Sequence, residues 1–283
     1  MSATYQELLL TTRKTLEQAE ISSAGLEARL IVAKAAGKSA DELMRDIRMY
    51  ADTERVEAVE DFVRRRLNGE PLAYIIGEWG FMGHIFEITH DTLIPRSDTE
   101  LLCETAIAAL PKGGKLLDLC CGSGCIGLAA LKEREDVSAA LVELSKSTLA
   151  VAKRNARKLG VSARAFFLSE DATMPLPEAL GEFDVVVSNP PYIPVAEIET
   201  LDHSVKDFEP HLALDGGDDG LNFYRSFARN LKRVVKPGGL LAVEVGMGQA
   251  LAVAELFRKA GWQDIEILPD LNGIDRVVKC TLA

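Results

Sequence analysis

The chain has 283 residues, of which 47% are hydrophobic and 27% are charged, so it can bury a large core without disulfides or a structural metal. Its net charge of −11 at pH 7 disfavours proteins that hold nucleic acid through phosphates, and we expect no stable nucleic acid binding. Five cysteines, three of them within six residues, make a poor disulfide framework and indicate a reducing, cytoplasmic compartment.

Residues 1–70 predict a small helical domain. Residues 1–20 are amphipathic and charged, without the apolar centre of a signal peptide. Residues 22–23 offer a cap for a second helix, which Gly37 ends. Ser39 and Glu42 form a capping-box signature for a short third helix, and Asp52 begins a fourth that runs to residues 68–69. No segment approaches the ~20 apolar residues that span a membrane, so we expect no membrane contact. We also expect a monomer.

Residues 71–96 have a different composition. Glycines at 77, 80 and 83 punctuate aromatic and β-branched residues, which predicts a β-hairpin from 71 to 94 linking two domains. Arg96 follows it, close to Asp98 and Glu100. It is a candidate either for a structural ion pair or for orienting a ligand.

Residues 97–283 alternate between strand and helix patterns. Helices are expected from Cys125, through residues 150–156, from 221 to 235, and up to Ala260. This alternation predicts an α/β domain with a doubly wound, mostly parallel, seven-stranded sheet. No helix separates the last two strands, which leaves the final strand free to run antiparallel. The expected strands are 115–119, 139–143, 165–168, 184–188, 240–245, 265–268 and 276–281.

The first strand-to-helix turn of this region is glycine-rich. Residues 122–127 fit the dinucleotide pattern G-x-G-x-x-G. However, Asp118 would repel a pyrophosphate, and it favours a cationic ligand such as S-adenosyl-L-methionine, which carries a sulfonium and an ammonium. A helix cap or loop acid is the alternative interpretation. The predicted loop for this methyl donor comprises Asp118, Cys120, Cys121, Gly122, Ser123 and Gly124.

Two further acids follow the next strands. Glu143 comes about twenty residues after the glycine loop, where a carboxylate accepts hydrogen bonds from ribose hydroxyls. Asp171 can accept from an adenine amino group, while the backbone N–H of Ala172 meets a ring nitrogen. A solvated Glu143 and a surface turn at Asp171 are the alternatives.

The fourth strand runs into Asn189, Pro190, Pro191 and Tyr192. Two prolines remove two backbone donors, so the acceptors facing a ligand are the Asn189 side-chain oxygen and the Pro190 carbonyl. Two acceptors match the two hydrogens of a planar –NH2 group, and Tyr192 offers an aromatic wall. Accepting both N–H groups directs the nitrogen lone pair toward the methyl carbon without a strong base. We predict Asn189, Pro190 and Tyr192 as catalytic and residues 189–192 as substrate-binding; a proline-rich turn is the alternative.

Metal binding is not expected. Cys120, Cys121 and Cys125 lack C-x-x-C spacing and a nearby histidine, so we interpret them as small apolar residues of a tight loop. Residues 215–220 contain three acids but not the alternate-residue pattern of calcium loops, which favours a flexible loop shaping the site.

The sequence resembles the bacterial glutamine methyltransferases that modify peptide chain release factors, the HemK/PrmC-type family. The resemblance extends over nearly the whole chain, and its most specific parts are Arg-x-Asp-Thr-Glu at 96–100 and Glu-Pro…Gly-Gly…Asp-Gly-Leu at 209–221. The other matching stretches are 71–77, 93–95, 118–124, 155–156, 189–193, 224–225 and 275–276.

The resemblance implies a helical domain that engages the release factor. It also implies transfer from S-adenosyl-L-methionine to the side-chain amide of the glutamine in a Gly-Gly-Gln motif. Residues 120–124, Glu143, 171–172 and Asn189 would hold the donor, and residues 189–192 the glutamine. The chain departs from the family pattern at Ser97, Cys120, Cys121, Glu143 and Ala172, where the family usually has Pro, Gly, Thr, Asp and an aromatic residue.

Two other functional classes fit parts of the pattern. A nucleic acid base-amino methyltransferase shares the Asn-Pro-Pro-Tyr logic, but the net charge of −11 disfavours it. A non-catalytic nucleotide-binding module or a NAD-dependent dehydrogenase fits the glycine loop, but Asp118 and the tetrapeptide disfavour both.

Overall fold

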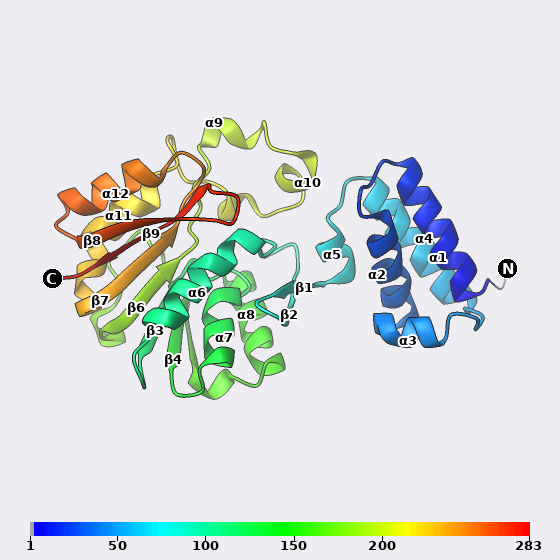
Figure 1. Ribbon diagram of the computed structural model, residues 1–283, viewed down its shortest axis with the longest axis horizontal. Coiled ribbons are helices and arrows are strands. Elements are labelled where there is room, and N and C mark those ends of the chain that lie inside the picture. Colours follow the sequence, from blue (N-terminus) through cyan, green and yellow to red (C-terminus); the bar gives the residue numbers. More distant parts are fainter. Residues whose placement is uncertain (1–2) are drawn as a thin grey trace. The chain divides into compact units, whose positions relative to one another are not determined.

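The computed structural model describes residues 3–283. The first two residues of the segment 1–20, in which we expected no signal peptide, lie outside the described residues. The chain divides into two compact units, one ending at Glu78 and one running from Trp79 to Ala283 (Figure 1). Within residues 3–283, no helix has both the length and the apolar character needed to cross a bilayer.

The first unit is helical, and its predicted caps at Ser39 and Asp52 are present. The cap predicted at residues 22–23 is not, because the Ser23 hydroxyl donates to the Glu27 carboxylate at 2.9 Å instead of accepting from a backbone N–H. Ser39 and Glu42 form a complete capping box before α3, and the Asp52 carboxylate accepts from the Arg55 N–H at 2.9 Å before α4. Gly37 ends α2 in the left-handed conformation, at φ 65°. The helices are α1 (Tyr5–Gln18), α2 (Ala24–Ala36), α3 (Ala40–Arg45), α4 (Thr53–Leu67) and α5 (Leu72–Ile76).

Helix α5 corrects the predicted hairpin, which was too long. All five residues of α5 are buried, so the segment has no solvent-facing side and its sequence shows no period. Pro71 supplies a φ of −58° at the cap, and Gly77 ends the helix at φ 75°. The hairpin itself is limited to β1 (Glu78–Phe81) and β2 (His84–Glu87).

The second unit contains the predicted seven-stranded sheet. Its strands lie in the order β5-β4-β3-β6-β7-β9-β8, and the first five are parallel. Strand β9 runs antiparallel to both β7 and β8. This direction agrees with the sequence, in which no helix is expected between the last two strands. The strands are β3 (Lys115–Leu119), β4 (Ser138–Val142), β5 (Ala165–Leu168), β6 (Phe183–Ser188), β7 (Val235–Glu244), β8 (Gln263–Pro269) and β9 (Asp275–Thr281).

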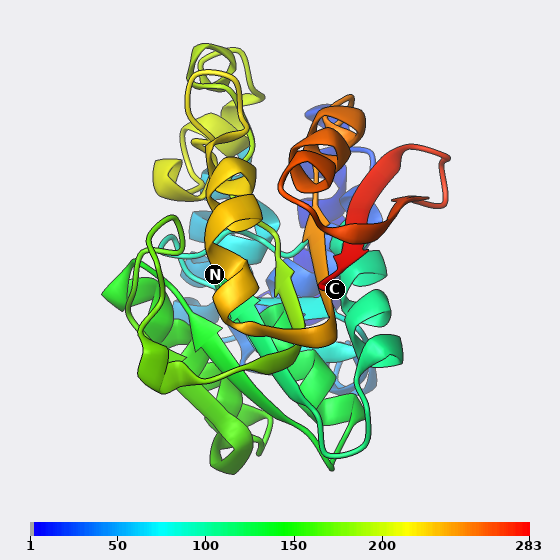
Figure 2. The ribbon, with the colours of Figure 1, turned by 90° about the vertical axis from the view of Figure 1, so that its left-hand side faces the viewer.

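Helices cover both faces of this sheet (Figure 2). Helices α11 (Asn222–Asn230) and α12 (Ala250–Lys259) bury Phe227, Val253 and Phe257 against Leu117 and Val243 of one face. The other face carries α6 (Glu100–Ala109), α7 (Cys125–Glu133) and α8 (Lys146–Lys158). The helix predicted from 221 to 235 ends earlier, because residue 235 already pairs with β6 as the first residue of β7.

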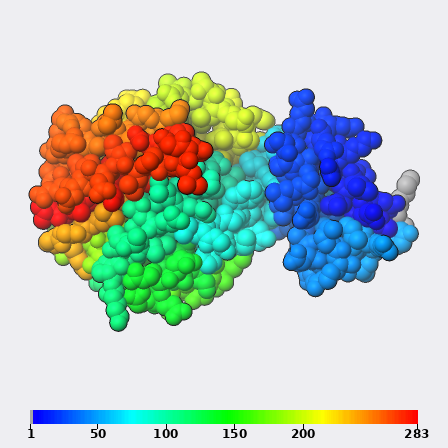
Figure 3. Space-filling model, in the orientation of Figure 1, coloured from blue at the N-terminus to red at the C-terminus, as the bar shows by residue number. Residues whose placement is uncertain are grey.

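The carboxyl-terminal strands reach the surface beside α6. In the space-filling view, the orange and red atoms of β8 and β9 lie next to the teal atoms of α6 (Figure 3). Arg276 of β9 pairs with Asp98, just before α6, at 3.3 Å, and with Asp270 at 3.3 Å. This pairing fixes the residues that precede α6.

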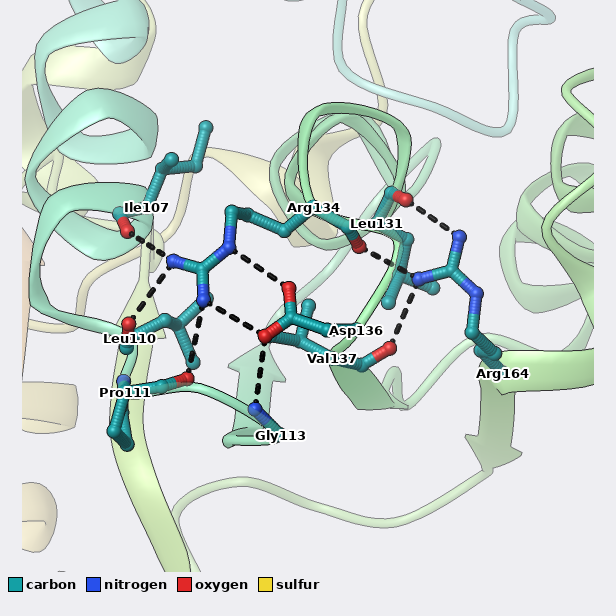
Figure 4. A network of polar contacts seen from close by, with 9 residues as sticks. All are labelled: Ile107, Leu110, Pro111, Gly113, Leu131, Arg134, Asp136, Val137 and Arg164. Carbon is teal, nitrogen blue, oxygen red and sulfur yellow. Dashed lines mark hydrogen bonds and ion pairs between the residues drawn. The ribbon is translucent and has the colours of Figure 1, made fainter.

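Two arginines satisfy carbonyl groups at the amino ends of β3 and β4 (Figure 4). Arg134 pairs with Asp136 at 3.0 Å and holds the pKa of that carboxyl well below its usual range. Positive groups here also complement the carboxyl ends of α6 and α7. Arg134 donates to the carbonyls of Leu110 and Pro111 at 3.0 and 3.2 Å, and Arg164 to those of Leu131, Arg134 and Val137 at 2.7, 2.8 and 2.9 Å.

Candidate active site

A cavity of about 230 Å³ opens at the carboxyl ends of β3, β4 and β6. Parallel α/β sheets bind ligands at this edge, beside the first strand-to-helix turn. The wall combines residues from the glycine loop, the ends of three further strands and the segment after the hairpin. Its residues include His90, Asp91, Leu93, Cys120, Gly122, Glu143, Ser145, Glu170, Asp171, Ala172, Asn189, Pro191, Pro210 and Phe223.

The glycine loop bends sharply after β3. Cys120, Gly122 and Gly124 all have positive φ angles, of 55°, 55° and 81°. Cys120 therefore occupies a left-handed position despite its Cβ, a conformation that costs about 1–2 kcal/mol in a non-glycine residue. Gly122 lines the cavity, and a Cβ added there would meet nothing within 4 Å. The missing side chain thus leaves open space on the wall for a ligand.

Glu143 lies on the cavity wall with a fixed orientation. Its Oε2 accepts from the Gly122 N–H and its Oε1 from the Ser145 N–H, both at 3.0 Å. Burial raises its pKa, while these N–H groups oppose the rise. Each oxygen keeps a further lone pair for a hydroxyl ligand. The side chain is half-buried on the wall, and its carboxylate is held by the loop.

Asp118 lies behind the loop rather than on the cavity wall. It is fully buried, and its Oδ2 accepts from the Gly127 N–H in the first turn of α7 at 2.9 Å. A Cβ on Gly127 would lie 2.9 Å from that same oxygen, so the glycine makes room for the carboxylate. Burial raises the pKa of Asp118 to about 7. A cation bound nearby would favour the ionised form.

Asp171 and Ala172 reach the wall from the loop after β5. The Asp171 Oδ1 accepts from the Thr173 N–H at 2.8 Å and the Thr173 hydroxyl at 2.7 Å, which makes a tight turn. Asp171 therefore forms a turn and also lines the cavity, so the two interpretations of this residue do not exclude each other. Ala172 is buried.

The cysteines of the loop are neutral thiols. Burial raises the pKa of Cys125 to about 12, and it raises the pKa values of Cys120 and Cys121 well above their usual range. Within residues 3–283, no group of three His, Cys, Asp or Glu side chains is placed to hold a metal ion. Thiols of this kind pack as small apolar groups.

The acceptor segment follows β6 directly. Ser188 fixes the strand end by donating to the Leu119 carbonyl at 2.8 Å. The Asn189 Nδ2 donates to the Thr99 hydroxyl oxygen at 3.2 Å, which leaves Oδ1 as the free acceptor of this amide. Asn189 and Pro191 line the cavity. Pro190 is buried within the segment.

Tyr192 points away from this cavity toward β7, and Phe223 of α11 is the aromatic residue on the wall. The Tyr192 hydroxyl lies 3.5 Å from the Oε1 of Glu244, the buried last residue of β7. Burial, first, and the Glu244 charge, second, raise the Tyr192 pKa well above its usual range. Tyr192 is therefore a neutral hydrogen-bond donor, and an aromatic wall at Tyr192 stays a prediction.

Residues 214–220 pack against the acceptor segment. The Ile193 N–H donates to the Leu214 carbonyl at 3.0 Å, and the Gly216 N–H donates to the Ile193 carbonyl at 2.9 Å. A Cβ on Gly216 would lie 2.7 Å from the Tyr192 Cα, and one on Gly220 would lie 2.3 Å from the Tyr192 carbonyl oxygen. The glycines are therefore required for close approach of two backbones.

Arg96 forms an ion pair, but with neither of its acidic neighbours in sequence. Its guanidinium contacts the buried Glu209 carboxylate, whose other oxygen accepts from the Ile94 N–H at 3.3 Å. Glu209 precedes Pro210, which lines the cavity. The pair thus connects residues 94–96 to the long loop after β6.

Several residues around the cavity were not predicted from the sequence as part of the site. They are His90 and Asp91 on the wall, Thr99 beside Asn189, and Gln249, which donates to the Tyr192 carbonyl at 2.9 Å. Only Thr99 carried a signal, because it lies in the Arg-x-Asp-Thr-Glu stretch. Of the predicted site residues, the cavity wall brings together Cys120, Gly122, Glu143, Asp171, Ala172, Asn189 and Pro191, whereas Asp118, Cys121, Ser123, Gly124, Pro190 and Tyr192 lie outside it.

The chain is similar to known proteins over nearly its whole length. Residues 7–77 match the family described as PrmC N-terminal domain, and residues 97–216 match the Methyltransferase small domain. A release factor glutamine methyltransferase of Caulobacter vibrioides is 40% identical over 280 residues, covering 98% of this chain and 96% of its own. Another from Geobacter sulfurreducens is 39% identical over 277 residues, covering 97% of this chain and 95% of its own.

A solved structure shares the fold at low sequence identity. A methyltransferase from Pyrococcus furiosus superimposes with a TM-score of 0.54 and 16% identity, covering 78% of this chain and 98% of that one. At this identity the likeness concerns the fold alone.

Proposed function

The chain belongs to the release factor glutamine methyltransferase family, and from this premise we propose that it methylates the glutamine of the Gly-Gly-Gln motif in peptide chain release factors. The methyl group comes from S-adenosyl-L-methionine and goes to the side-chain amide nitrogen. The observation that carries this proposal is one cavity whose wall holds Glu143 and Gly122 of the donor region together with Asn189 of the acceptor segment.

The cavity fits the donor in charge and in hydrogen bonding. Glu143 is oriented by two backbone N–H groups and keeps acceptor capacity for the two ribose hydroxyls. Gly122 leaves open space where the donor approaches the loop. Asp171 and the Ala172 N–H would meet the adenine edge. Asp118 acts from behind the loop through its charge, and it fixes the start of α7. When bound, S-adenosyl-L-methionine supplies an electrophilic methyl group on a sulfonium.

The acceptor segment prepares the glutamine amide. The Asn189 Oδ1 and the Pro190 carbonyl would accept the two N–H groups of the substrate amide, which fixes the plane and direction of its nitrogen. Two acceptors also increase electron density on a nitrogen whose lone pair is delocalised. The same oxygens hydrogen-bond the proton that the nitrogen loses to solvent once it carries the methyl group. No histidine is needed for these steps.

The remaining assignments concern partners. We assign residues 1–70 to recognition of the release factor, residues 71–96 to the linker and residues 97–283 to methyl transfer. We further propose a cytoplasmic monomer without stable nucleic acid binding, which agrees with five free cysteines and a net charge of −11.

Transfer from labelled donor tests the proposal. The substrates are a bacterial release factor, its Gly-Gly-Glu variant, and bulk RNA and DNA. We expect label only on the first. Label on nucleic acid, with none on the release factor, would instead establish a base-amino methyltransferase.

A further inference from the structure

A chain of polar groups lies behind the acceptor segment, outside the cavity. The Asn189 Nδ2 donates to the Thr99 hydroxyl oxygen at 3.2 Å. The Thr99 hydroxyl faces the Glu244 carboxylate, and the Oε2 of that carboxylate is buried without a hydrogen-bond partner among the described residues. The Tyr192 hydroxyl approaches the same carboxylate at 3.5 Å. Thr99 and Glu244 are 2% and 3% exposed, so water does not compete for these contacts. The chain thus joins both ends of the acceptor segment to one buried acid.

An asparagine amide can be placed with its oxygen and nitrogen exchanged, and only its hydrogen-bond partners decide between the two orientations. If the nitrogen faced the substrate, two N–H donors would oppose an –NH2 group that itself can only donate. Methyl transfer to an amide nitrogen therefore requires Asn189 in one orientation.

The direction of the hydrogen bonds follows from the charge of Glu244. An ionised carboxylate only accepts, and a threonine hydroxyl has one proton to donate. When Thr99 gives that proton to Glu244, its oxygen is left as an acceptor toward Asn189. The Asn189 –NH2 group must then turn toward Thr99, and its oxygen toward the substrate.

We propose that Glu244, acting through Thr99, is a positioning residue that fixes the amide orientation of Asn189 for a substrate nitrogen. This inference rests on the proposed function, because it concerns the atom that binds the glutamine amide. Tyr192 donates to the same acid and so couples the far end of the segment to it.

The surroundings allow Glu244 to titrate near neutrality. Burial raises its pKa to about 7, opposed by the nearby Thr99 hydroxyl and the positive charge of Arg276, while Asp98 contributes to the rise. The neutral hydroxyl of Tyr192 favours the ionised form by its hydrogen bond. Tyr224 packs beside it and donates to the Glu244 backbone carbonyl at 2.8 Å. Once protonated, Glu244 can itself donate to Thr99, which permits the reversed amide.

The test compares steady-state methylation of a release factor by four variants at saturating donor. We expect Thr99→Val to lower kcat by about tenfold to hundredfold, the effect of one misdirected hydrogen bond, with donor affinity changed less than about twofold. Thr99→Ser keeps the hydroxyl and should retain most of the activity. In Glu244→Gln the new amide can present either its oxygen or its –NH2 group to Thr99. The fall in kcat should therefore be smaller, about threefold to tenfold. The double variant should lose no more than Thr99→Val alone.

The pH profile separates positioning from mere packing. In the wild-type enzyme, kcat should fall as the pH drops through about 7. This acidic limb should vanish in Glu244→Gln and also in Thr99→Val, where Glu244 remains but is disconnected. Matched controls are Thr105→Val in α6, whose hydroxyl bonds only the Leu101 carbonyl of its own helix, and Glu255→Gln on the surface of α12.

Two results would overturn the inference: full kcat in Thr99→Val, or an unchanged acidic limb in both variants. If Glu244→Gln fails to fold, Thr99→Val and Thr99→Ser still decide. Wild-type activity on the release factor is measured in the same series, so a failure of the proposed function is seen separately.

Discussion

Removing the Glu143 carboxylate should weaken donor binding by a predictable amount. Its two oxygens are oriented by the Gly122 and Ser145 N–H groups, each at 3.0 Å, and it lies on the cavity wall. Hydrogen bonds to a charged group contribute about 1.5–3 kcal/mol each. In Glu143→Ala, water replaces part of what the ribose loses, so we expect a net loss of about 1.5–3 kcal/mol, or a Kd about 10-fold to 150-fold higher.

Calorimetric titration of S-adenosyl-L-methionine into the protein measures this change. Glu170→Ala is the matched control, because Glu170 is an exposed acid on the same cavity wall. This variant removes the same charge, but the Glu170 carboxylate is exposed and the Glu143 carboxylate is oriented by backbone N–H groups. The Kd of Glu170→Ala for the donor should therefore stay within about threefold of wild type. Thermal unfolding without donor checks that the glycine loop remains folded. Equal losses in the two variants, or an unchanged Kd in Glu143→Ala, would refute the assignment.

Three further predictions address the loop, the acceptor segment and the scaffold. Because burial raises the pKa of Asp118 to about 7 and a cationic donor prefers its ionised form, donor affinity should fall as the pH drops below about 7; a titration series should show this fall and its absence in Asp118→Asn. Gly220→Ala adds a Cβ 2.3 Å from the Tyr192 carbonyl oxygen at φ 73°, so turnover should fall at least tenfold while donor affinity, measured in parallel, changes little; normal turnover would show that the two loops are not held this closely. Arg164→Ala leaves three carbonyls without their donor and should lower the free energy of unfolding by about 2–3 kcal/mol in urea denaturation, against almost no change for the exposed Arg157→Ala.

The parts of the fold that depend on residues close to one another in the sequence were predictable. Helix starts at Ser39 and Asp52 follow from side chains that reach a backbone N–H three residues later. The parallel sheet follows from alternating strand and helix patterns. Helix α5 was not predictable in this way, since a fully buried five-residue run shows no contrast between two faces. The start of β7 at Val235 depends on pairing with Phe183, which no local pattern reveals.

The site shows the same division. Glu143 and Asn189 were predictable because each follows a strand that ends at the ligand-binding edge of the sheet. The bond from Asn189 to Thr99 joins residues 90 positions apart, and the contact from Tyr192 to Glu244 spans 52. Such contacts arise only when strands and helices have packed. Asp118 was expected at the ligand, but its strand position points the side chain under α7, where Gly127 makes room for it.

Locating the methyl group by tandem mass spectrometry tests the central claim most directly. A release factor incubated with donor and enzyme should carry one methyl on the side-chain nitrogen of the Gly-Gly-Gln glutamine. With Asn189→Ala that methyl should be absent, while donor binding, measured separately, falls less. A methyl on another residue, or full modification by Asn189→Ala, would contradict transfer at the acceptor segment.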